Sequence, residues 1–133
     1  MRIVSGKFKS INLYGPKDKK IRPLKDMVRE SIFNFLTHSK KISFKIEGSN
    51  ILDLYSGTGS FGLECLSRNA NKIIFIEKEK EAIKILEKNI KKIKQSKNAE
   101  IIHNDALSLI RKNIINLKFN LIFCDPPFND KNV

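Results

Sequence analysis

The spacing of apolar positions divides the chain into two parts, and the first part covers roughly its first 45 residues. Alternation over Arg2–Leu13 predicts a β-hairpin that turns at Gly6, and a polar loop follows at residues 14–20. A helix is expected after Arg22-Pro23, fading near residues 37–39. Four apolar residues share one side of this helix and form its expected buried face: Val28, Ile32, Phe35 and Leu36.

From Asn50 onward, short apolar runs alternate with helical patterns. Runs without internal alternation are typical of buried parallel strands, and apolar stripes of period 3.6 indicate helices. The expected strands are residues 50–55, 72–77, 100–103 and 119–124. Between them, helices are expected over residues 61–67, over 79–95 and from Ala106 to about Ile114. This alternation predicts right-handed βαβ units, and therefore an α/β fold with a parallel sheet.

Length and composition narrow the class of protein. The chain has 133 residues and is 41% hydrophobic, which suits one domain with a real core. No apolar run reaches the roughly 18–20 residues of a membrane span, and none follows the charged N-terminus as in a secretory signal. Cys65 and Cys124 have no metal-type spacing and are expected to be reduced. We therefore expect a cytoplasmic protein without a membrane partner.

The net charge of +12 is unevenly distributed. The 21 lysines, 20 isoleucines and 13 asparagines, against 5 arginines, are what an AT-rich genome would give through codon usage, so part of the charge is compositional drift. Residues 1–50 hold 12 basic and 4 acidic residues, whereas residues 51–133 hold 14 and 10. A basic front end predicts an anionic partner for the N-terminal part. A solvated lysine-rich surface is the alternative.

A glycine-rich turn follows the strand at residues 50–55. Gly57-Thr58-Gly59-Ser60-Phe61-Gly62 matches G-x-G-x-x-G between a strand and a helix, and Glu77 ends the next strand, where it could accept ribose hydroxyls. Asp53 lies just before the turn. A carboxylate there repels a pyrophosphate but suits an ammonium or sulfonium group, which favours S-adenosylmethionine over NAD. The alternative is that Asp53 only caps the turn.

A second motif, Asp125-Pro126-Pro127-Phe128, follows the last predicted strand. Two prolines remove N–H donors and leave carbonyls that only accept hydrogen bonds. Asp125 and the Pro126 carbonyl could hold both hydrogens of an exocyclic nucleobase amine, while Phe128 stacks on an unpaired or flipped base. A plain turn with a buried Phe is the alternative. No partner for acid–base, metal or nucleophilic chemistry accompanies His38, His103 or Cys124.

Taken in order, these motifs resemble the S-adenosylmethionine-dependent amino-methyltransferases of the Rossmann-like class. Three further segments are similar to the bacterial guanine-N2 methyltransferases of small-subunit (16S) ribosomal RNA: MRIVSGK at 1–7, RPLKDMVRESIFN at 22–34 and LECLSR at 63–68. The likeness covers nearly the whole chain. It implies that Glu77 holds the cofactor ribose and that Asp125–Phe128 surround the target guanine.

The same resemblance implies further roles. The segment Asn104-Asp105-Ala106 would lie at the adenine, with Asp105 contacting its amine, while Asp53, Tyr55 and the Gly57–Gly59 turn, which includes Thr58, would lie near the methionine end. The hairpin and the Arg22-Pro23 segment would face RNA and cover the cofactor. The expected RNA-binding residues are Arg2, Lys7, Lys9 and Arg22.

The resemblance also sets the expected organisation. A single methyltransferase domain would comprise an RNA-facing part, residues 1–45, and a cofactor-binding α/β part, residues 46–133. Leu24 stands where the family usually has threonine, and the family's seven strands exceed the four found here, so the later strands are expected to be missing. The strand at 119–124 would then be an exposed edge.

The function this implies is methyl transfer to the N2 amine of a guanine in 16S ribosomal RNA, free or in an assembling small ribosomal subunit. We expect a monomer that needs no metal. Two alternatives stay open at this point. One is methylation of adenine N6 in DNA or RNA, because Asp-Pro-Pro-Phe accepts either amine, and the other is a truncated, non-catalytic RNA-binding module.

Overall fold

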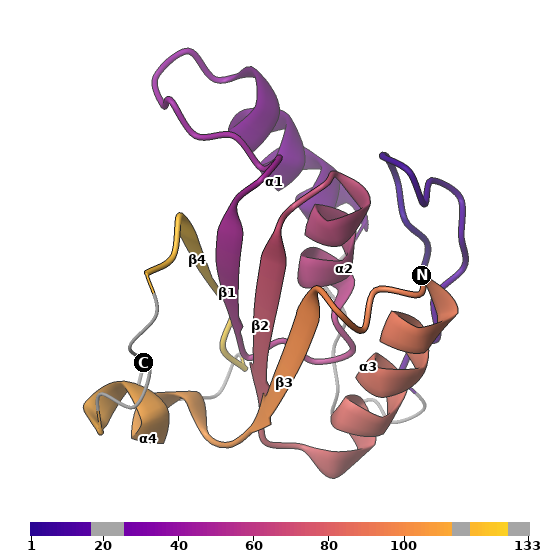
Figure 1. The fold of residues 1–133 in the computed structure, drawn as a ribbon, viewed down its shortest axis with the longest axis vertical. Coiled ribbons are helices and arrows are strands. Elements are labelled where there is room, and N and C mark those ends of the chain that lie inside the picture. Colours follow the sequence, from indigo (N-terminus) through magenta and orange to yellow (C-terminus); the bar gives the residue numbers. More distant parts are fainter. Residues whose placement is uncertain (17–25, 113–117, 128–133) are drawn as a thin grey trace.

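The computed structural model describes residues 1–16, 26–112 and 118–127, and at its centre lies a parallel sheet (Figure 1). The strands are β1 (Asn50–Leu54), β2 (Lys72–Glu77), β3 (Ala99–His103) and β4 (Leu121–Cys124), in the spatial order β3-β2-β1-β4. All three neighbouring pairs are parallel. The predicted α/β fold with a parallel sheet is therefore confirmed.

Helices cover both faces of the sheet. They are α1 (Asp26–His38), α2 (Ser60–Ser67), α3 (Lys80–Lys92) and α4 (Ala106–Arg111). Successive residues of a strand point to opposite faces, so Ile51 joins the cluster under α1, α2 and α3, whereas Leu52 joins the cluster under α4. The predicted helical position Ile114 lies outside the described residues.

The buried face of α1 differs from the prediction. Val28 and Phe35 are exposed at 46% and 54%, while Arg29 and Phe33 are buried at 1% each. Ile32 and Leu36 pack against the core as predicted, so the contact stripe passes through Arg29, Ile32, Phe33 and Leu36 and is rotated away from Val28 and Phe35. The reason is that the Arg29 guanidinium donates to the Arg2 carbonyl at 2.6 Å and to Asp26 at 3.0 Å, which a search for apolar positions cannot anticipate.

The N-terminal hairpin forms in outline but not as two regular strands. Its antiparallel pairing in the described residues is a single bridge between Arg2 and Asn12, with a backbone bond from Ile3 N–H to the Ile11 carbonyl beside it. Several amides that would extend the ladder donate instead to α2. Lys7 N–H, for example, bonds the Ser67 carbonyl at 2.8 Å. The prediction of two strands turning at Gly6 was therefore too regular.

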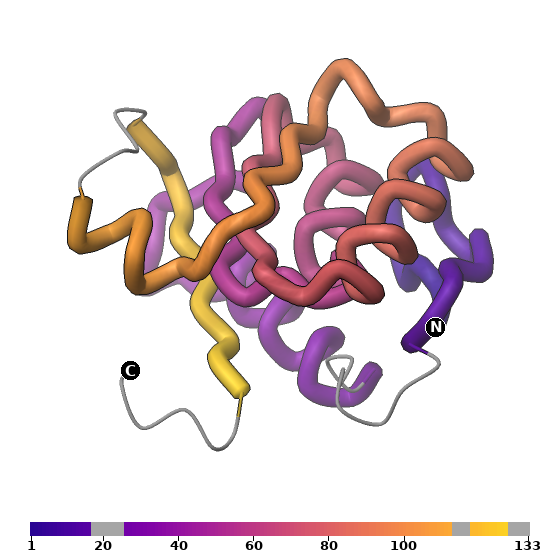
Figure 2. Tube along the Cα trace, turned by 90° about the horizontal axis from the view of Figure 1, so that it is seen from below, coloured from indigo at the N-terminus to yellow at the C-terminus, as the bar shows by residue number. Residues whose placement is uncertain are grey.

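β4 is an edge strand of the described sheet, as predicted, because it pairs with β1 alone there. Its Ile122 is 58% exposed, while Phe123 on the other face stacks on Phe61 of α2 with ring centroids 3.8 Å apart. Phe61 in turn lies 5.0 Å from Phe33 of α1. Seen from below in Figure 2, β4 and the N-terminal segment lie on opposite sides of the molecule. Of the helices described, none has the length and apolar character needed to cross a bilayer.

Candidate functional site

The candidate site lies where the parallel strands end. Asp53 is the fourth residue of β1, Glu77 is the last of β2, and Asp125 follows the last residue of β4. Leu54 pairs with Ile76 on one side and with Cys124 on the other, so Glu77 and Asp125 each lie one residue beyond this level of the sheet. The topology therefore brings three sequence-predicted residues to one edge, because the carboxyl ends of parallel strands coincide.

Asp53 is the most buried of the three carboxylates, at 1% exposure. Its Oδ2 accepts a hydrogen bond from Gly62 N–H in the first turn of α2 at 3.2 Å. Burial raises the pKa of Asp53 to about 8, against the lowering effect of the Gly62 bond, and the charges of Asp125 and Glu77 add to the rise. Asp53 thus makes the capping contact that was one interpretation of this residue, and the pKa of its carboxyl group is strongly raised.

Each glycine of the predicted turn has a different physical environment. Gly57 has φ +58°, and a Cβ built there would meet nothing within 4 Å. Gly59 has φ +93°, and a Cβ there would lie 2.3 Å from Leu86 Cδ1 of α3. A Cβ at Gly62 would lie 2.3 Å from the Phe75 ring. Gly59 therefore lets the turn approach α3, and Gly62 lets α2 approach β2, whereas Gly57 leaves open space beside the turn.

Glu77 supports the turn from the next strand. Its Oε1 accepts a hydrogen bond from Gly57 N–H at 2.8 Å, and its Oε2 accepts from the backbone N–H groups of Lys78 and Glu79 at 2.9 Å each. These bonds fix the orientation of the carboxylate at the strand end. The carboxylate oxygens of Glu77 keep further lone pairs, so the expected ribose contact would be a role in addition to these backbone bonds.

The segment Asn104-Asp105-Ala106 forms the entry to α4. Asp105 is its N-cap, and its side chain accepts from Ser108 N–H at 3.0 Å, while Asn104 Oδ1 accepts from Asp105 N–H at 2.7 Å. Ala106 is buried at 3% in the cluster under α4. These local bonds hold the segment at the end of β3, at the same edge as Glu77.

The Asp-Pro-Pro-Phe motif is described in part. Asp125 and Pro126 are half-buried and Pro127 is exposed, while Phe128 lies outside the described residues. Asp125 is close enough to Asp53 to raise the pKa of that buried group. The start of the motif is therefore at the same edge as the glycine turn. Within the described residues, no group of three or more His, Cys, Asp or Glu side chains is placed to hold a metal ion.

Asn89 of α3 is a site residue that sequence reasoning missed. It is fully buried, and its amide group donates to the Thr58 carbonyl and to the Tyr14 carbonyl, each at 3.1 Å. Its Oδ1 accepts from Tyr14 N–H at 2.7 Å. Asn89 thus ties the glycine turn to the N-terminal segment. A signal for this role was its position inside the apolar stripe of α3, between Leu86 and Ile90.

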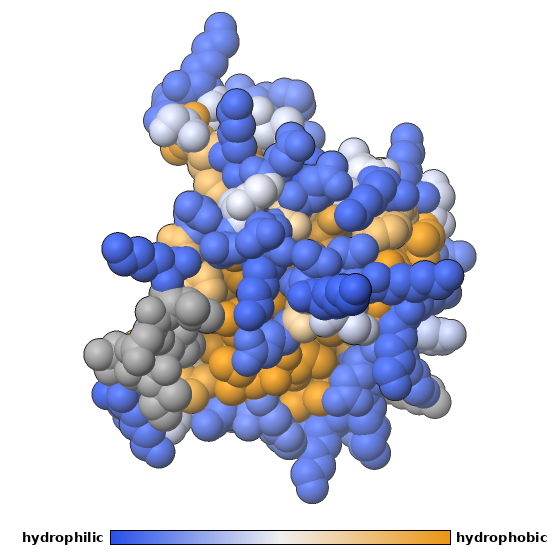
Figure 3. Space-filling model, viewed as in Figure 1, coloured by the Kyte–Doolittle hydropathy of each residue, from blue (hydrophilic) through white to orange (hydrophobic). Residues whose placement is uncertain are grey.

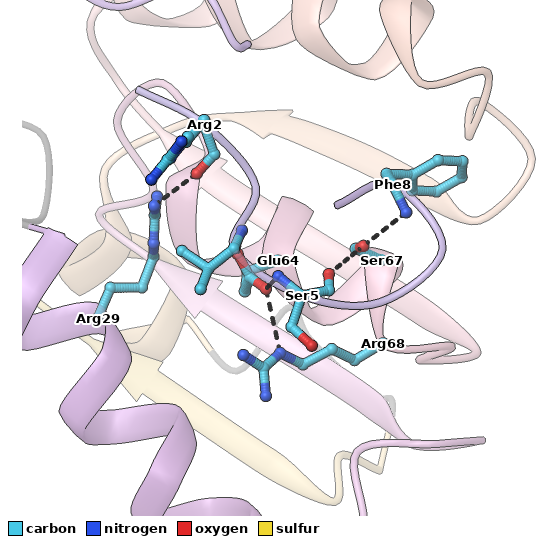
Figure 4. A network of polar contacts seen from close by, with 8 residues as sticks. Arg2, Ser5, Phe8, Arg29, Glu64, Ser67 and Arg68 are labelled. Atoms are coloured by element: carbon cyan, nitrogen blue, oxygen red, sulfur yellow. Dashed lines mark hydrogen bonds and ion pairs between the residues drawn. The ribbon is translucent and has the colours of Figure 1, made fainter. Parts of the chain in front are cut away.

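Glu64 of α2 is a second residue that was missed, and it anchors the N-terminal segment (Figure 4). It has 0% exposure and accepts hydrogen bonds from Val4 N–H at 2.8 Å and from Ser5 N–H at 3.0 Å. Arg68 donates to the same carboxylate through Nε at 3.1 Å. A buried glutamate in an otherwise apolar helix was the signal for such a role.

The predicted RNA-binding residues do not lie at the carboxyl edge. Arg2, Lys7 and Lys9 are exposed, and Lys7 N–H contacts the last residue of α2, at the opposite end of that helix from the glycine turn. Arg22 lies outside the described residues. The basic side chains of the hairpin therefore form a surface apart from the three carboxylates.

The residues present fit a nucleoside cofactor with a cationic end. Among the described residues, the hydroxyl groups of Ser56 and Thr58 are buried without a hydrogen-bond partner, so the turn offers unused polar groups. The open side of Gly57 leaves room for ligand atoms against the backbone. Figure 3 shows an apolar area over the lower part of the strands, in an otherwise mostly hydrophilic face.

Comparison with known proteins finds relatives over nearly the whole chain. The chain is 34% identical over 130 residues to the ribosomal RNA small subunit methyltransferase D of Haemophilus influenzae, which covers 97% of this chain and 64% of that protein. The protein of the same name from Escherichia coli K12 is 33% identical, over 96% of this chain and 60% of its own length. This chain thus spans about 60–64% of these two relatives.

Solved structures share the fold. That of yhhF from Escherichia coli superposes with a TM-score of 0.77 at 31% identity, over 96% of this chain and 64% of that one. A Thermus protein, at a TM-score of 0.79 and 23% identity, shares the fold alone. The family described as conserved hypothetical protein 95 matches residues 1–133, the full length of the chain. The protein therefore belongs to the conserved hypothetical protein 95 family.

Proposed function

We propose that the protein transfers a methyl group from S-adenosylmethionine to the exocyclic N2 amine of a guanine in small-subunit ribosomal RNA. The observation that carries this is the meeting of Asp53, the glycine turn and Glu77 with the start of the Asp-Pro-Pro-Phe motif at one sheet edge. The names of the relatives support the RNA class. We further propose that the protein acts in the cytoplasm as a monomer, on free RNA or on an assembling subunit.

The cofactor would be held by the β1 and β2 ends. Glu77 would accept the ribose hydroxyls, Asp105 would face the adenine amine, and Asp53 would lie toward the methionine end. When bound, S-adenosylmethionine supplies a methyl group on an electrophilic sulfonium. The backbone bonds to Glu77 and Asp53 already fix the turn, so the protein contributes orientation before any ligand binds.

The substrate amine would be held by Asp125 and the Pro126 carbonyl. A nucleobase amine is a weak nucleophile because its lone pair is delocalised into the ring. When both N–H bonds are accepted by fixed oxygens, the nitrogen is drawn toward a tetrahedral shape and its lone pair is directed away from the ring. Phe128 would stack on the base, which must leave its helix to enter.

The test is incubation of the chain with 16S ribosomal RNA, or with small subunits lacking the modification, and methyl-labelled S-adenosylmethionine. Digestion to nucleosides should give labelled N2-methylguanosine. Asp125→Ala should abolish the labelling while leaving cofactor affinity nearly unchanged, and Glu77→Ala should weaken cofactor binding. Labelled N6-methyladenosine would instead support the adenine alternative. Salt-sensitive RNA binding with no cofactor binding by calorimetry would support a non-catalytic RNA-binding module.

A further inference from the structure

Three carboxylates meet at the carboxyl edge without an ion pair to balance them in the described part of the chain. The ion pairs found there join other groups, and none includes Asp53, Glu77 or Asp125. Glu77 is compensated by three backbone N–H groups, whereas Asp53 is compensated by the single N–H of Gly62 among the described residues. Asp53 is therefore the least exposed of the three acids, and it accepts fewer backbone hydrogen bonds than Glu77 does.

The described elements packed around Asp53 supply no free cation either. α2 contributes Cys65, whose pKa is raised by burial and by Asp53, and Glu64, whose charge is balanced by Arg68. Asp125, just after β4, acts on Asp53 from the neighbouring strand end. Cys124 pairs in register with Leu54 and is exposed, and its pKa is raised by partial desolvation and by Asp125 and Asp53. The titratable neighbours of Asp53 that have no ion-pair partner are therefore carboxyl or thiol groups. None of them stabilises a negative charge on Asp53.

Burial and these neighbours raise the pKa of Asp53 to about 8, so below that pH the free protein holds Asp53 as the neutral acid. A ligand that carries positive charge into the edge reverses the balance, because it stabilises the carboxylate and not the acid. A ligand of the same shape without that charge has no such effect. The proton state of Asp53 is thus coupled to the charge of whatever binds.

We propose that Asp53 is the residue by which the site selects a cationic methionine end, releasing one proton to solvent when S-adenosylmethionine binds and taking one up when the ligand leaves. This rests on the proposed function, since it assumes that cofactor. The balance is simple: neutral Asp53 and the cationic ligand give an Asp53 carboxylate beside the bound cation and one proton in the buffer. A neutral adenosine thioether would bind with Asp53 still protonated.

The sign of the pH dependence follows. Below the raised pKa of Asp53, each unit of falling pH makes the proton harder to displace, so affinity for S-adenosylmethionine should fall about tenfold per unit. The window from about pH 5.5 to 7 is suitable, because the ligand's own α-amino group, with an ordinary pKa near 8, stays mainly protonated there. Over that window the affinity should change about 30-fold.

The experiment is titration calorimetry of the 133-residue chain at about pH 6.5, in phosphate and in imidazole buffer. The difference in heat between buffers of unlike ionisation enthalpy counts the protons exchanged. The probes are S-adenosylmethionine and uncharged 5′-methylthioadenosine, which keeps the adenosine and lacks the charged end. Wild type should release about one proton with the first probe and none with the second.

Two variants complete the test. Asp53→Asn keeps an oxygen that can accept from Gly62 N–H but carries no titrating group, so proton release and the pH dependence should both disappear. Glu87→Gln removes one exposed carboxylate on α3 and should behave as wild type. Binding of both probes without proton release, or equal release with both, would overturn this inference alone. Failure of both probes to bind would overturn the proposed cofactor and this inference together.

Discussion

At the scale of single residues, the turn after β1 shows that one sequence pattern can serve two physical purposes. Gly59 is required by close packing, because a Cβ would lie 2.3 Å from Leu86 of α3. Gly57 faces open space, and its φ of +58° is a conformation that other residues can adopt at a modest cost. The motif G-x-G-x-x-G therefore does not assign the same role to each glycine. Stability and ligand binding should separate between these two positions.

Gly57→Ala and Gly59→Ala form a matched pair that tests this separation. Gly59→Ala should lower the free energy of unfolding by about 2–5 kcal/mol, because a left-handed alanine is combined with overpacking against Leu86. Gly57→Ala should cost only about 1–2 kcal/mol, from the backbone alone. Its new methyl group should nevertheless weaken S-adenosylmethionine binding. Urea unfolding and calorimetry measure the two effects, and equal destabilisation by both substitutions would contradict the packing role of Gly59.

At the scale of elements, the period of the apolar positions was enough to predict β1 to β4 and the helices between them. Apolar runs are typical of strands covered on both faces, and β1 and β2 are buried in this way. β4 is equally apolar in sequence, but its Ile122 is 58% exposed. The face of α1 could be predicted in this way only in part, through Ile32 and Leu36. Arg29 is buried because it meets a backbone carbonyl 27 residues away, and Phe33 is buried against Phe61 of α2. Contacts made by tertiary structure leave no local period.

Phe33 and Phe35 test which face of α1 carries the packing. They lie two residues apart on the same helix and have the same side chain, but Phe33 is 1% exposed and Phe35 is 54% exposed. Phe33→Ala should lower the free energy of unfolding by about 3–5 kcal/mol. Phe35→Ala should cost no more than about 1 kcal/mol. Equal midpoints of urea unfolding for the two variants would mean that α1 docks through the face expected from apolar period.

At the scale of the whole molecule, the N-terminal segment is joined to the sheet by buried polar residues. Glu64 and Asn89 accept from backbone N–H groups 60 and 75 residues away in sequence. The acids and glycines at the strand ends could be predicted as part of the site, since the topology of a parallel sheet alone brings them to one edge. These two anchors could not be predicted, because a buried polar side chain reveals its partner only in the folded chain. They fix where the basic hairpin surface lies relative to the carboxyl edge.

That placement makes the RNA-binding surface testable by charge. Replacing Arg2, Lys7 and Lys9 together by Gln should weaken binding to 16S ribosomal RNA and reduce the slope of log affinity against log salt by about 2, at roughly 0.7 for each phosphate that the variant no longer neutralises. The matched control replaces Lys84, Lys88 and Lys91 by Gln, which removes the same number of charges from exposed positions on α3. Fluorescence anisotropy between about 50 and 200 mM salt gives both slopes.

If the surface formed by Arg2, Lys7 and Lys9 binds RNA, the control variant on α3 should keep nearly the full slope. Its three substitutions remove only long-range attraction to RNA, which salt screens. Equal reductions in the two variants would mean that RNA responds to the net charge of +12 and not to the hairpin. The two variants therefore distinguish a specific RNA-binding surface from lysines acquired by drift in composition. The net charge alone cannot make this distinction.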